Sequence, residues 1–545
     1  MTALRKVWGW GLEGQNVSET ETKALAQIFG ARFGEVLHAS PGPKLEDFVV
    51  RKPRVHVPTA LAALCRTDEH DRLVHAYGKS FPDYVRMLDR HVPCPPDFVC
   101  YPESEQHVTA VLEWAASKSV AVIAFGGGSS VCGGVECDVG EAYTGVISLD
   151  MGRMNKVAEI DRTSRVARIQ AGTFGPALEA QLKPHGLSLR HFPQSFEFST
   201  LGGWIATRSG GHFATLYTHI DDFVEAMRVV TPQGVMETRR VPGSGAGPQP
   251  ERLFIGSEGI LGVITEAWMR VQDAPKFRAS ASVKFQDFMT GAEAVRLIAQ
   301  SRLNPSNCRL IDAEEALGTG AGDGSASLMV LAFESADHAQ DAKLARAIEI
   351  ARQCGGDIDA PKSLSGSQHR EGSAGAWRNA FLRAPYYREV LTPMGVIVDT
   401  FETAITWDRF LAFHTQIKHR MHDVLKRVTG KPGHVTCRFT HAYPDGPAPY
   451  YTFQALGRKS GMMEQWREIK AAANDVVVAA GGTITHHHAV GRDHRSGYVK
   501  ECPPLFAAAL QAVKAQLDPA GILNPGVLID PLNKRVGVRG AMEGL

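Results

Sequence analysis

A run of small residues at positions 125–134 constrains this chain more than any other feature, because it follows directly on a short apolar strand at 120–124. The run holds five glycines and two serines between Phe125 and Gly134. Glycine has no Cβ, so such a loop can turn tightly and direct several backbone N–H groups at one anion. A pyrophosphate needs many donors at close range. The run therefore predicts a nucleotide cofactor, with a glycine-rich turn that binds nothing as the alternative.

Neither of the two commonest phosphate-binding loops fits this run. Val131 stands where the third glycine of a Rossmann G-x-G-x-x-G would be, and the Lys-Ser/Thr that ends a P-loop is missing. The cofactor is therefore expected to be held by a different kind of phosphate-binding loop.

Composition describes an ordinary globular protein and excludes several classes. The chain has 545 residues, of which 44% are hydrophobic and 21% charged, and its net charge of +1 gives no electrostatic case for nucleic acid. Nine scattered cysteines without a C-x-x-C pair favour a reducing compartment without disulfides or zinc. No secretory signal, peroxisomal address or membrane-length apolar run is visible. We expect a cytoplasmic protein, with peripheral membrane contact left open.

The pattern of elements predicts an α+β chain in four parts. Residues 1–95 read as a largely helical and irregular N-terminal segment that ends at a group of prolines. Residues 96–275 alternate short helices, strands and glycine loops, which indicates the cofactor domain. Ser104 can cap its first helix, and 157–160 and 166–169 read as a hairpin. Residues 276–480 carry long amphipathic helices at 407–424 and 462–480, with glycine-rich stretches at 317–327 and 364–375, and read as a cap, or substrate, domain. Residues 481–545 read as a C-terminal segment.

Three further loops of small residues follow the first, at 194–203, 207–211 and 258–264, and a D-P-x-x-x-x-N-P-G stretch begins at Asp518. In this order they resemble the FAD-binding domain of the vanillyl-alcohol oxidase and p-cresol methylhydroxylase superfamily. The resemblance implies two α+β subdomains that enclose FAD in an extended conformation. Many superfamily members tether FAD through a histidine in the first loop. That loop has none here, so we expect non-covalent FAD, with Cys132 as the one alternative tether.

Within the superfamily the chain is similar to the alkylglycerone-phosphate synthase family. The similarity rests on the Trp8–Gly11 opening, the loops at 196–204 and 256–267, and the triple histidine that opens 486–491, and it runs from about residue 8 to about residue 530. It implies lipid substrates: the acyl group of acyl-dihydroxyacetone phosphate is exchanged for a fatty alcohol without net redox change. A proton would leave C1, flavin N5 would form an adduct with that carbon, and the fatty carboxylate would depart before the alcohol attacks. A homodimer and an apolar tunnel for the alkyl chains are also expected.

The same resemblance assigns the residues around FAD. Those of the first loop would hold the two phosphates, and those of the later loops would surround the rest of the cofactor: Gly126, Gly127, Gly128, Ser129, Ser130, Val131, Cys132, His191, Gln194, Ser195, Phe196, Glu197, Phe198, Ser199, Thr200, Thr207, Arg208, Ser209, Gly210, Glu258, Gly259, Ile260, Leu261, Gly262, Val263 and Ile264. For Arg208 a surface salt bridge is the equal alternative, and for His191 a structural role.

Tyr451 matches the family's proton-transfer tyrosine, and Arg383 and Arg309 match its substrate-binding and activity-linked arginines. A phenol needs nearby positive charge to act as a base at neutral pH. Strand alternation would put Tyr450 and Tyr451 on opposite faces, so only one of them can face the flavin. For Arg309 a salt bridge with Asp312 is the alternative.

His486, His487 and His488 complete the predicted catalytic set. They follow a strand-like segment at 483–485, so His486 and His488 would share one face and His487 would point away. They are expected to hold phosphate and assist the tyrosine. A metal site is not expected, because the three lack the i, i+4 spacing of a zinc helix and an acidic neighbour in the sequence.

The main alternative is an FAD-linked oxidase or dehydrogenase of a 2-hydroxy acid such as D-lactate. Those relatives carry a Gly-Glu-His-Gly-type motif where this chain has the triple histidine and no glutamate, which favours the synthase. A flavin protein without catalysis is a second alternative. Gln194, found where an acidic residue is expected, and the extension beyond 530 depart from the family pattern and leave room for another substrate.

Overall fold

A four-stranded sheet presents the first glycine loop at its edge. The computed structural model describes residues 4–217, 219–358, 362–365 and 373–534. Strands lie in the order β1-β2-β4-β3, with bounds Cys65–Arg66, Phe98–Cys100, Gly145–Asp150 and Val120–Phe125. β3 and β4 are parallel, so the loop leaves the carboxyl edge of the sheet at Phe125. Helix α4 (Glu105–Lys118) packs its apolar face on this sheet, and the predicted cap, Ser104, accepts the N–H of His107.

A five-stranded antiparallel sheet forms the second layer. Its order is β5-β6-β10-β8-β9, with bounds Val157–Asp161, Val166–Gln170, Val263–Arg270, Val224–Thr231 and Gly234–Glu237. The expected hairpin is confirmed as β5 and β6, which pair antiparallel. The helices beside this sheet are short: α5 (Gly175–Leu182), α6 (Leu201–Thr207), α7 (Ala214–Tyr217) and α8 (Ile220–Phe223).

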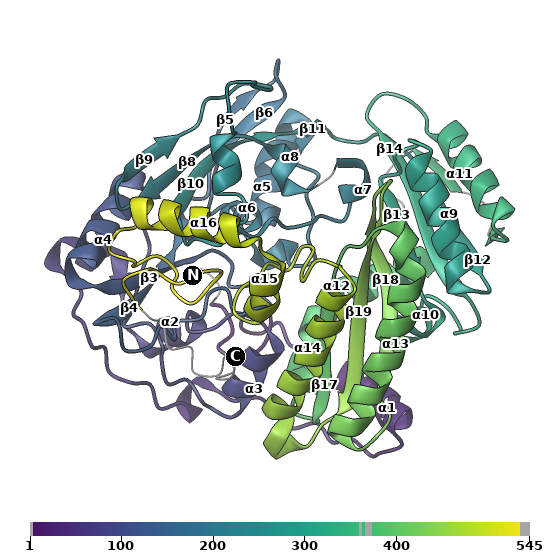
Figure 1. Ribbon diagram of the computed structural model, residues 1–545, viewed down its shortest axis with the longest axis horizontal. Coiled ribbons are helices and arrows are strands. Elements are labelled where there is room, and N and C mark those ends of the chain that lie inside the picture. The colour runs from purple at the N-terminus through teal and green to yellow at the C-terminus, as the bar shows by residue number, and fades with distance from the viewer. Residues whose placement is uncertain (1–3, 218, 359–361, 366–372, 535–545) are drawn as a thin grey trace.

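A larger antiparallel sheet dominates the other half of the molecule (Figure 1). Its path is β15-β12-β14-β13-β18-β19-β17, with bounds Asp357–Ile358, Phe277–Phe285, Ser327–Ser335, Asn307–Ile311, His434–Ala442, Pro447–Leu456 and Val396–Glu402, and β16 (Lys362–Ser365) pairs with β12. Four helices bury one face of it: α9 (Phe288–Gln300), α11 (Asp341–Gln353), α13 (Trp407–Thr429) and α14 (Met462–Ala479). The long helices expected at 407–424 and 462–480 are therefore present, and this mixture of helix and sheet confirms the α+β class.

The N-terminal segment lies against this larger half. Helix α1 (Glu19–Phe33) begins at a Ser18 capping box and packs on α12 (Ser373–Leu391) through Leu25 and Phe29. The remaining elements are α2 (Glu69–Val74), α3 (Phe81–Leu88), β7 (Leu187–Ser188), β11 (Gln272–Asp273), α10 (Ala313–Gly318), α15 (Arg495–Glu501) and α16 (Pro504–Leu517).

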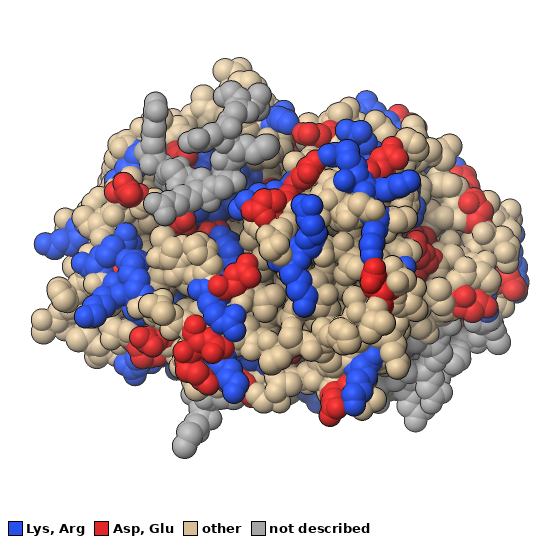
Figure 2. All heavy atoms as spheres, turned by 90° about the horizontal axis from the view of Figure 1, so that it is seen from below, with Lys and Arg blue, Asp and Glu red and all other residues tan. Residues whose placement is uncertain are grey.

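Positive and negative side chains lie intermingled on the face shown in Figure 2, which agrees with the net charge of +1. No helix among the described residues is both long and apolar enough to cross a membrane.

The C-terminal stretch, which carries the D-P-x-x-x-x-N-P-G pattern, returns to the first sheet. Leu523 forms a parallel bridge with Val122 of β3. The side-chain amide of Asn524 donates to the carbonyls of Gly134 and Glu258, at 3.0 and 2.6 Å, and so connects the first and fourth glycine loops. This connection orients two walls of one site.

A buried ion pair anchors the returning chain. Lys514 Nζ lies 3.1 Å from Asp518, both side chains are at most 1% exposed, and Nζ also donates to the carbonyls of Ile260 and Leu523. Asp518 in turn accepts the N–H groups of residues 522 and 523. One ammonium thus satisfies groups from three segments.

We predict that Lys514→Met lowers the free energy of unfolding by about 3 kcal/mol, because it leaves a buried carboxylate without its cation. Lys500→Met is the matched control, since Lys500 pairs with Asp475 at 3.0 Å on the surface and exposed pairs contribute little. Denaturant unfolding of both variants measures the difference. Equal losses in the two variants would contradict the anchoring role of Lys514.

Candidate active site

One cavity of about 480 Å³ runs along the glycine loops to the uncovered face of the larger sheet. Its floor comes from the first loop, at 126–132, and from the fourth, at 258–264. Its roof comes from strands β13, β17, β18 and β19. The returning chain and the two sheets therefore enclose a single site.

The glycines of the first loop are required by close packing. A Cβ on Gly127 would lie 1.6 Å from the carbonyl oxygen of Phe198, and one on Gly126 would lie 2.2 Å from Thr200 Oγ1. Gly128 has a φ of +68°, which favours glycine. Within the described chain, the backbone N–H groups of 127–132 donate to no protein acceptor. The loop thus presents a row of donors that an anion can accept.

Most of the predicted cofactor residues line this cavity. They are Gly126, Gly127, Gly128, Ser129, Ser130, Val131, Cys132, Gln194, Ser195, Ser199, Thr200, Thr207, Ser209, Gly210, Glu258, Gly259, Gly262, Val263 and Ile264. The others lie outside its wall: His191, Phe196, Glu197, Phe198, Arg208, Ile260 and Leu261.

The outlying residues have structural partners instead. His191 is buried behind the wall, where its Nε2 lies 2.8 Å from Ser209 Oγ and desolvation lowers its pKa to about 3. Arg208 caps α6 and pairs with Asp221 at 2.9 Å, with 64% of its side chain exposed, so the salt-bridge alternative is the one the structure supports. Ile260 and Leu261 are fully buried in the core of the second layer. These side chains therefore do not line the cavity.

Polar side chains line the roof of the cavity. On the roof strands, every other residue points into the core of the larger half, and the residues between them point into the cavity. On β18, Val435, Cys437 and Phe439 enter the core while Thr436, Arg438 and Thr440 line the cavity. On β19 the same alternation sends Tyr450, Thr452 and Gln454 to the cavity.

Tyr451 is therefore on the wrong face for the predicted role. Its side chain is fully buried, stacks on Phe401 at 5.0 Å between ring centroids, and its hydroxyl lies 3.0 Å from His414 Nδ1 of α13. The structure brings Tyr450 to the cavity instead. Reading Tyr451 together with the apolar Phe453 and Ala455 would have placed it in the core.

Tyr450 has cationic and imidazole neighbours. The Arg438 guanidinium carbon lies 4.0 Å from its ring centroid, and His488 meets it edge-on at 5.3 Å. Burial raises the pKa of Tyr450, and the charge of Arg438 and a hydrogen bond with Thr400 oppose that rise. The pKa of Tyr450 is therefore raised overall, and Arg438 is the first of the neighbours that oppose the rise.

Arg383 also lies away from the cavity. Its guanidinium donates to Glu21 of α1 at 2.8 Å and remains 37% exposed. Arg388 lies five residues further along α12, about 140° around the helix, and does line the cavity. It pairs with Asp399 at 2.6 Å and donates to the carbonyl of Lys79. Of these two arginines of α12, Arg388 lines the cavity and Arg383 does not.

Arg309 is where a substrate arginine would be. It is 3% exposed on β13, lines the cavity, and its guanidinium carbon lies 5.4 Å from the Phe381 ring centroid, on which Arg438 also rests at 5.7 Å. Burial, together with the charge of Arg438, lowers the pKa of Arg309 to about 9. Arg438, which sequence reasoning missed, pairs with Glu315 at 2.6 Å. Two guanidiniums therefore share one part of the roof.

The triple histidine lies on a loop, so the expected strand at 483–485 and its alternation are wrong. The fully buried carboxylate of Glu402 accepts the N–H groups of His486, His487 and His488 at 2.6 to 3.2 Å, and the hydroxyl of Thr485 at 2.6 Å. Burial alone would raise the pKa of Glu402, but these imidazoles and hydrogen bonds hold it well below its usual value. His487 and His488 line the cavity, whereas His486 lies behind it.

The far end of the cavity is apolar. Leu25, Ile28 and Phe29 of α1 line it together with Leu391 of α12 and Val398 of β17. Ile28 is 52% exposed, which places this end near solvent. The N-terminal Trp10 also lines the cavity and packs edge-on against Phe198 at 5.8 Å.

Comparison with known proteins bears on both halves of this arrangement. Residues 96–239 match the family described as FAD binding domain, and residues 274–528 match FAD linked oxidases, C-terminal domain. The chain is 31% identical over 518 residues to alkyldihydroxyacetonephosphate synthase of Dictyostelium discoideum, covering 92% of this chain and 83% of that protein.

The chain belongs to the alkyldihydroxyacetonephosphate synthase family.

Solved structures agree with this membership. A structure of alkyldihydroxyacetonephosphate synthase superposes with a TM-score of 0.79 at 27% identity, covering 95% of this chain and 98% of the other. p-Cresol methylhydroxylase, at 14% identity and a TM-score of 0.67, shares the fold. FAD is accordingly the cofactor of this family member, and the loop donors and the close approach at Gly127 fit its pyrophosphate.

Cys132 of this chain is the alternative to non-covalent FAD, because its thiol is the candidate tether. Its thiol is buried, donates to the carbonyl of His488 at 3.1 Å, and burial raises its pKa well above the usual value. A protonated, hydrogen-bonded thiol is a poor nucleophile, which supports non-covalent FAD as a proposal.

We predict that Gly127→Ala abolishes FAD retention, because the added methyl group would push the first loop off the second. Gly243→Ala, in an exposed loop where a Cβ meets nothing within 4 Å, is the matched control. The ratio of flavin to protein absorbance after gel filtration measures the effect. Full flavin content in Gly127→Ala would contradict the packing argument.

Proposed function

We propose that this chain catalyses the family reaction, the exchange of the acyl group of acyl-dihydroxyacetone phosphate for a fatty alcohol. The observation that carries the proposal is a single cavity that the FAD cradle, the arginines of the roof and an apolar cluster from α1, α12 and β17 all line. A lipid with an anionic head and a long chain fits these surfaces. The products are the ether, the fatty carboxylate and one proton, so no oxidant is needed.

The apolar end would take the alkyl chains. Leu25, Ile28 and Phe29 lie on one face of α1, and burying each CH₂ of a fatty chain against such a wall contributes about 0.8 kcal/mol. The position of Ile28 near solvent supports entry of the chains from the α1 side, where contact with a membrane surface would deliver them.

The arginines of the roof would hold the anionic groups. Arg309 and Arg438 share the Phe381 ring, and two neighbouring guanidiniums suit a phosphate dianion. Arg388, which reaches the cavity from α12, would bind the departing carboxylate.

Tyr450 would move the C1 proton. Bound FAD would supply an electron-accepting ring for this chemistry. Arg438, on the face of Tyr450, favours the phenolate that accepts the proton, and His487 and His488 lie against its ring to stabilise the charge. The glutamate-held loop keeps both imidazoles in place.

A direct assay tests the proposal against the oxidase alternative. Purified yellow protein is incubated with palmitoyl-dihydroxyacetone phosphate and labelled hexadecanol. Labelled ether without loss of flavin absorbance supports the synthase. Bleaching of the flavin by D-lactate without ether formation supports a dehydrogenase, and neither result supports a flavin protein without catalysis.

The two adjacent tyrosines provide a matched pair of variants. Tyr450→Phe is expected to lower kcat at least about 100-fold, since it removes the proton-transfer group. Tyr451→Phe is expected to keep kcat and to cost about 1 kcal/mol of stability through its lost bond to His414. The reverse order of activities would return the role to Tyr451.

The two arginines of α12 provide a second pair. Arg388→Met is expected to lower kcat/KM about 100-fold by removing a charge-assisted contact of about 3 kcal/mol. Arg383→Met, which loses a half-exposed pair with Glu21, is expected to change kcat/KM less than about twofold. Steady-state kinetics with varied acyl substrate measure both, and a larger loss in Arg383→Met would contradict the assignment.

A further inference from the structure

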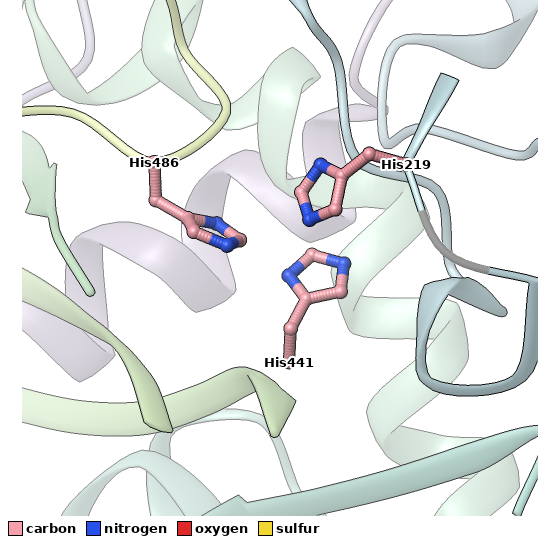
Figure 3. Close-up of side chains that lie close together, drawn as sticks. All are labelled: His219, His441 and His486. Carbon is pink, nitrogen blue, oxygen red and sulfur yellow. The ribbon is translucent and has the colours of Figure 1, made fainter. Parts of the chain in front are cut away.

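Three histidines from distant segments converge beside the cavity (Figure 3). His219 precedes α8 in the second layer, His441 is on β18 of the larger sheet, and His486 is on the C-terminal loop. One ring nitrogen of each lies within 4.8 Å of the other two. Convergence of imidazole nitrogens from three parts of the chain is an arrangement that a metal ion can use, because each ring offers one ligand atom.

Two of the rings are oriented by backbone carbonyls. His219 makes a backbone hydrogen bond with Arg208, and His441 Nε2 lies 3.1 Å from the carbonyl oxygen of Gly211. A ring N–H held by a carbonyl fixes the tautomer and leaves the other nitrogen with a lone pair. In His219 that nitrogen contacts the Tyr443 hydroxyl, and in His441 it lies 3.1 Å from Thr440 Oγ1, so a metal ion would replace these two contacts. Metal-binding histidines are oriented in this way in most known sites.

A tyrosine oxygen completes the group. The hydroxyl of Tyr443 lies 2.7 Å from His486 Nε2 and also contacts His219 Nε2. The Tyr443 hydroxyl therefore stands between two imidazole nitrogens with a single proton to share. The alternative to a cation here is a chain of hydrogen bonds through these rings.

We propose that His219, His441 and His486 bind one divalent transition-metal ion of the zinc class, with Tyr443 as the fourth ligand. Imidazole and phenol oxygen are donors that such ions accept. Zinc–nitrogen bonds of about 2.1 Å put ligand nitrogens about 3.4 Å apart, so nitrogens that lie within 4.8 Å of one another need to approach by at most about 1.4 Å. The ion would fasten the second layer, the larger sheet and the histidine loop to one another.

Two other groups of histidine and acidic side chains fit a metal ion less well. Glu402, with His486 and His487, forms a second candidate, but its carboxylate already accepts the donors that hold the loop. Asp68, His70 and Asp71 form a third group at a helix start on the surface, where Asp68 serves as the N-cap of α2.

The test uses untagged, FAD-loaded full-length protein, so that no added histidines bind metal. The protein is freed of loose ions on a chelating resin, titrated with Zn²⁺ or Co²⁺, and analysed by elemental analysis. We expect about one ion per chain, a cobalt absorption spectrum typical of tetrahedral coordination, and a rise in the thermal midpoint on zinc addition.

His219→Asn is the diagnostic variant, because asparagine can keep a hydrogen bond to Tyr443 but is a poor ligand for zinc. It is expected to lose the ion, the cobalt spectrum and the thermal shift while keeping its FAD content, which shows that it folds. His422→Asn, on an exposed face of α13, is the matched control and should bind like the wild type. Failure of the wild type to bind either ion at micromolar concentration, or equal binding by His219→Asn, would overturn the proposal and leave the hydrogen-bonded chain.

Discussion

The two-residue alternation of β18 and β19 is the constraint on which the rest of the site depends. Helices α13 and α14 bury one face of these strands, so Cys437, Phe439 and Phe453 must point into the core. The other face is then left to polar side chains, and it closes over the FAD cradle. A shift of register by one residue would bring the core side chains into the cavity. The same strands thus supply core residues from one face and site residues from the other.

Glu402 connects that sheet to the histidine loop and so completes the site. It lies at the end of β17, beside Tyr450 in the register, and its carboxylate holds the histidine loop through three backbone N–H groups. On the other side, Asn524 connects the glycine loops to the returning chain. The FAD cradle, the roof and the histidines are therefore held by hydrogen bonds between segments that are far apart in the sequence.

The sequence predicted local features well and spatial roles less well. The strand before the glycine loop, the β5–β6 hairpin, the Ser104 cap and the FAD cofactor follow from local pattern and motif. Tyr451 and Arg383 were chosen by motif similarity alone, although strand alternation and helical angle distinguish them from Tyr450 and Arg388. The histidine loop was read as a strand because its fold depends on Glu402, which lies 84 residues from His486 and has no local signal. Most of the glycine-rich stretch at 364–375 lies outside the described residues.

The most direct measurement of the central account is hydrogen exchange at C1 of the substrate. FAD-loaded protein is incubated with palmitoyl-dihydroxyacetone phosphate in D₂O without alcohol, and the recovered lipid is analysed by mass spectrometry and NMR. If a side chain of the roof transfers the proton without net oxidation, deuterium appears at C1 and the flavin spectrum stays that of the oxidised form. A substrate recovered without deuterium, or a flavin reduced by it, would contradict the account.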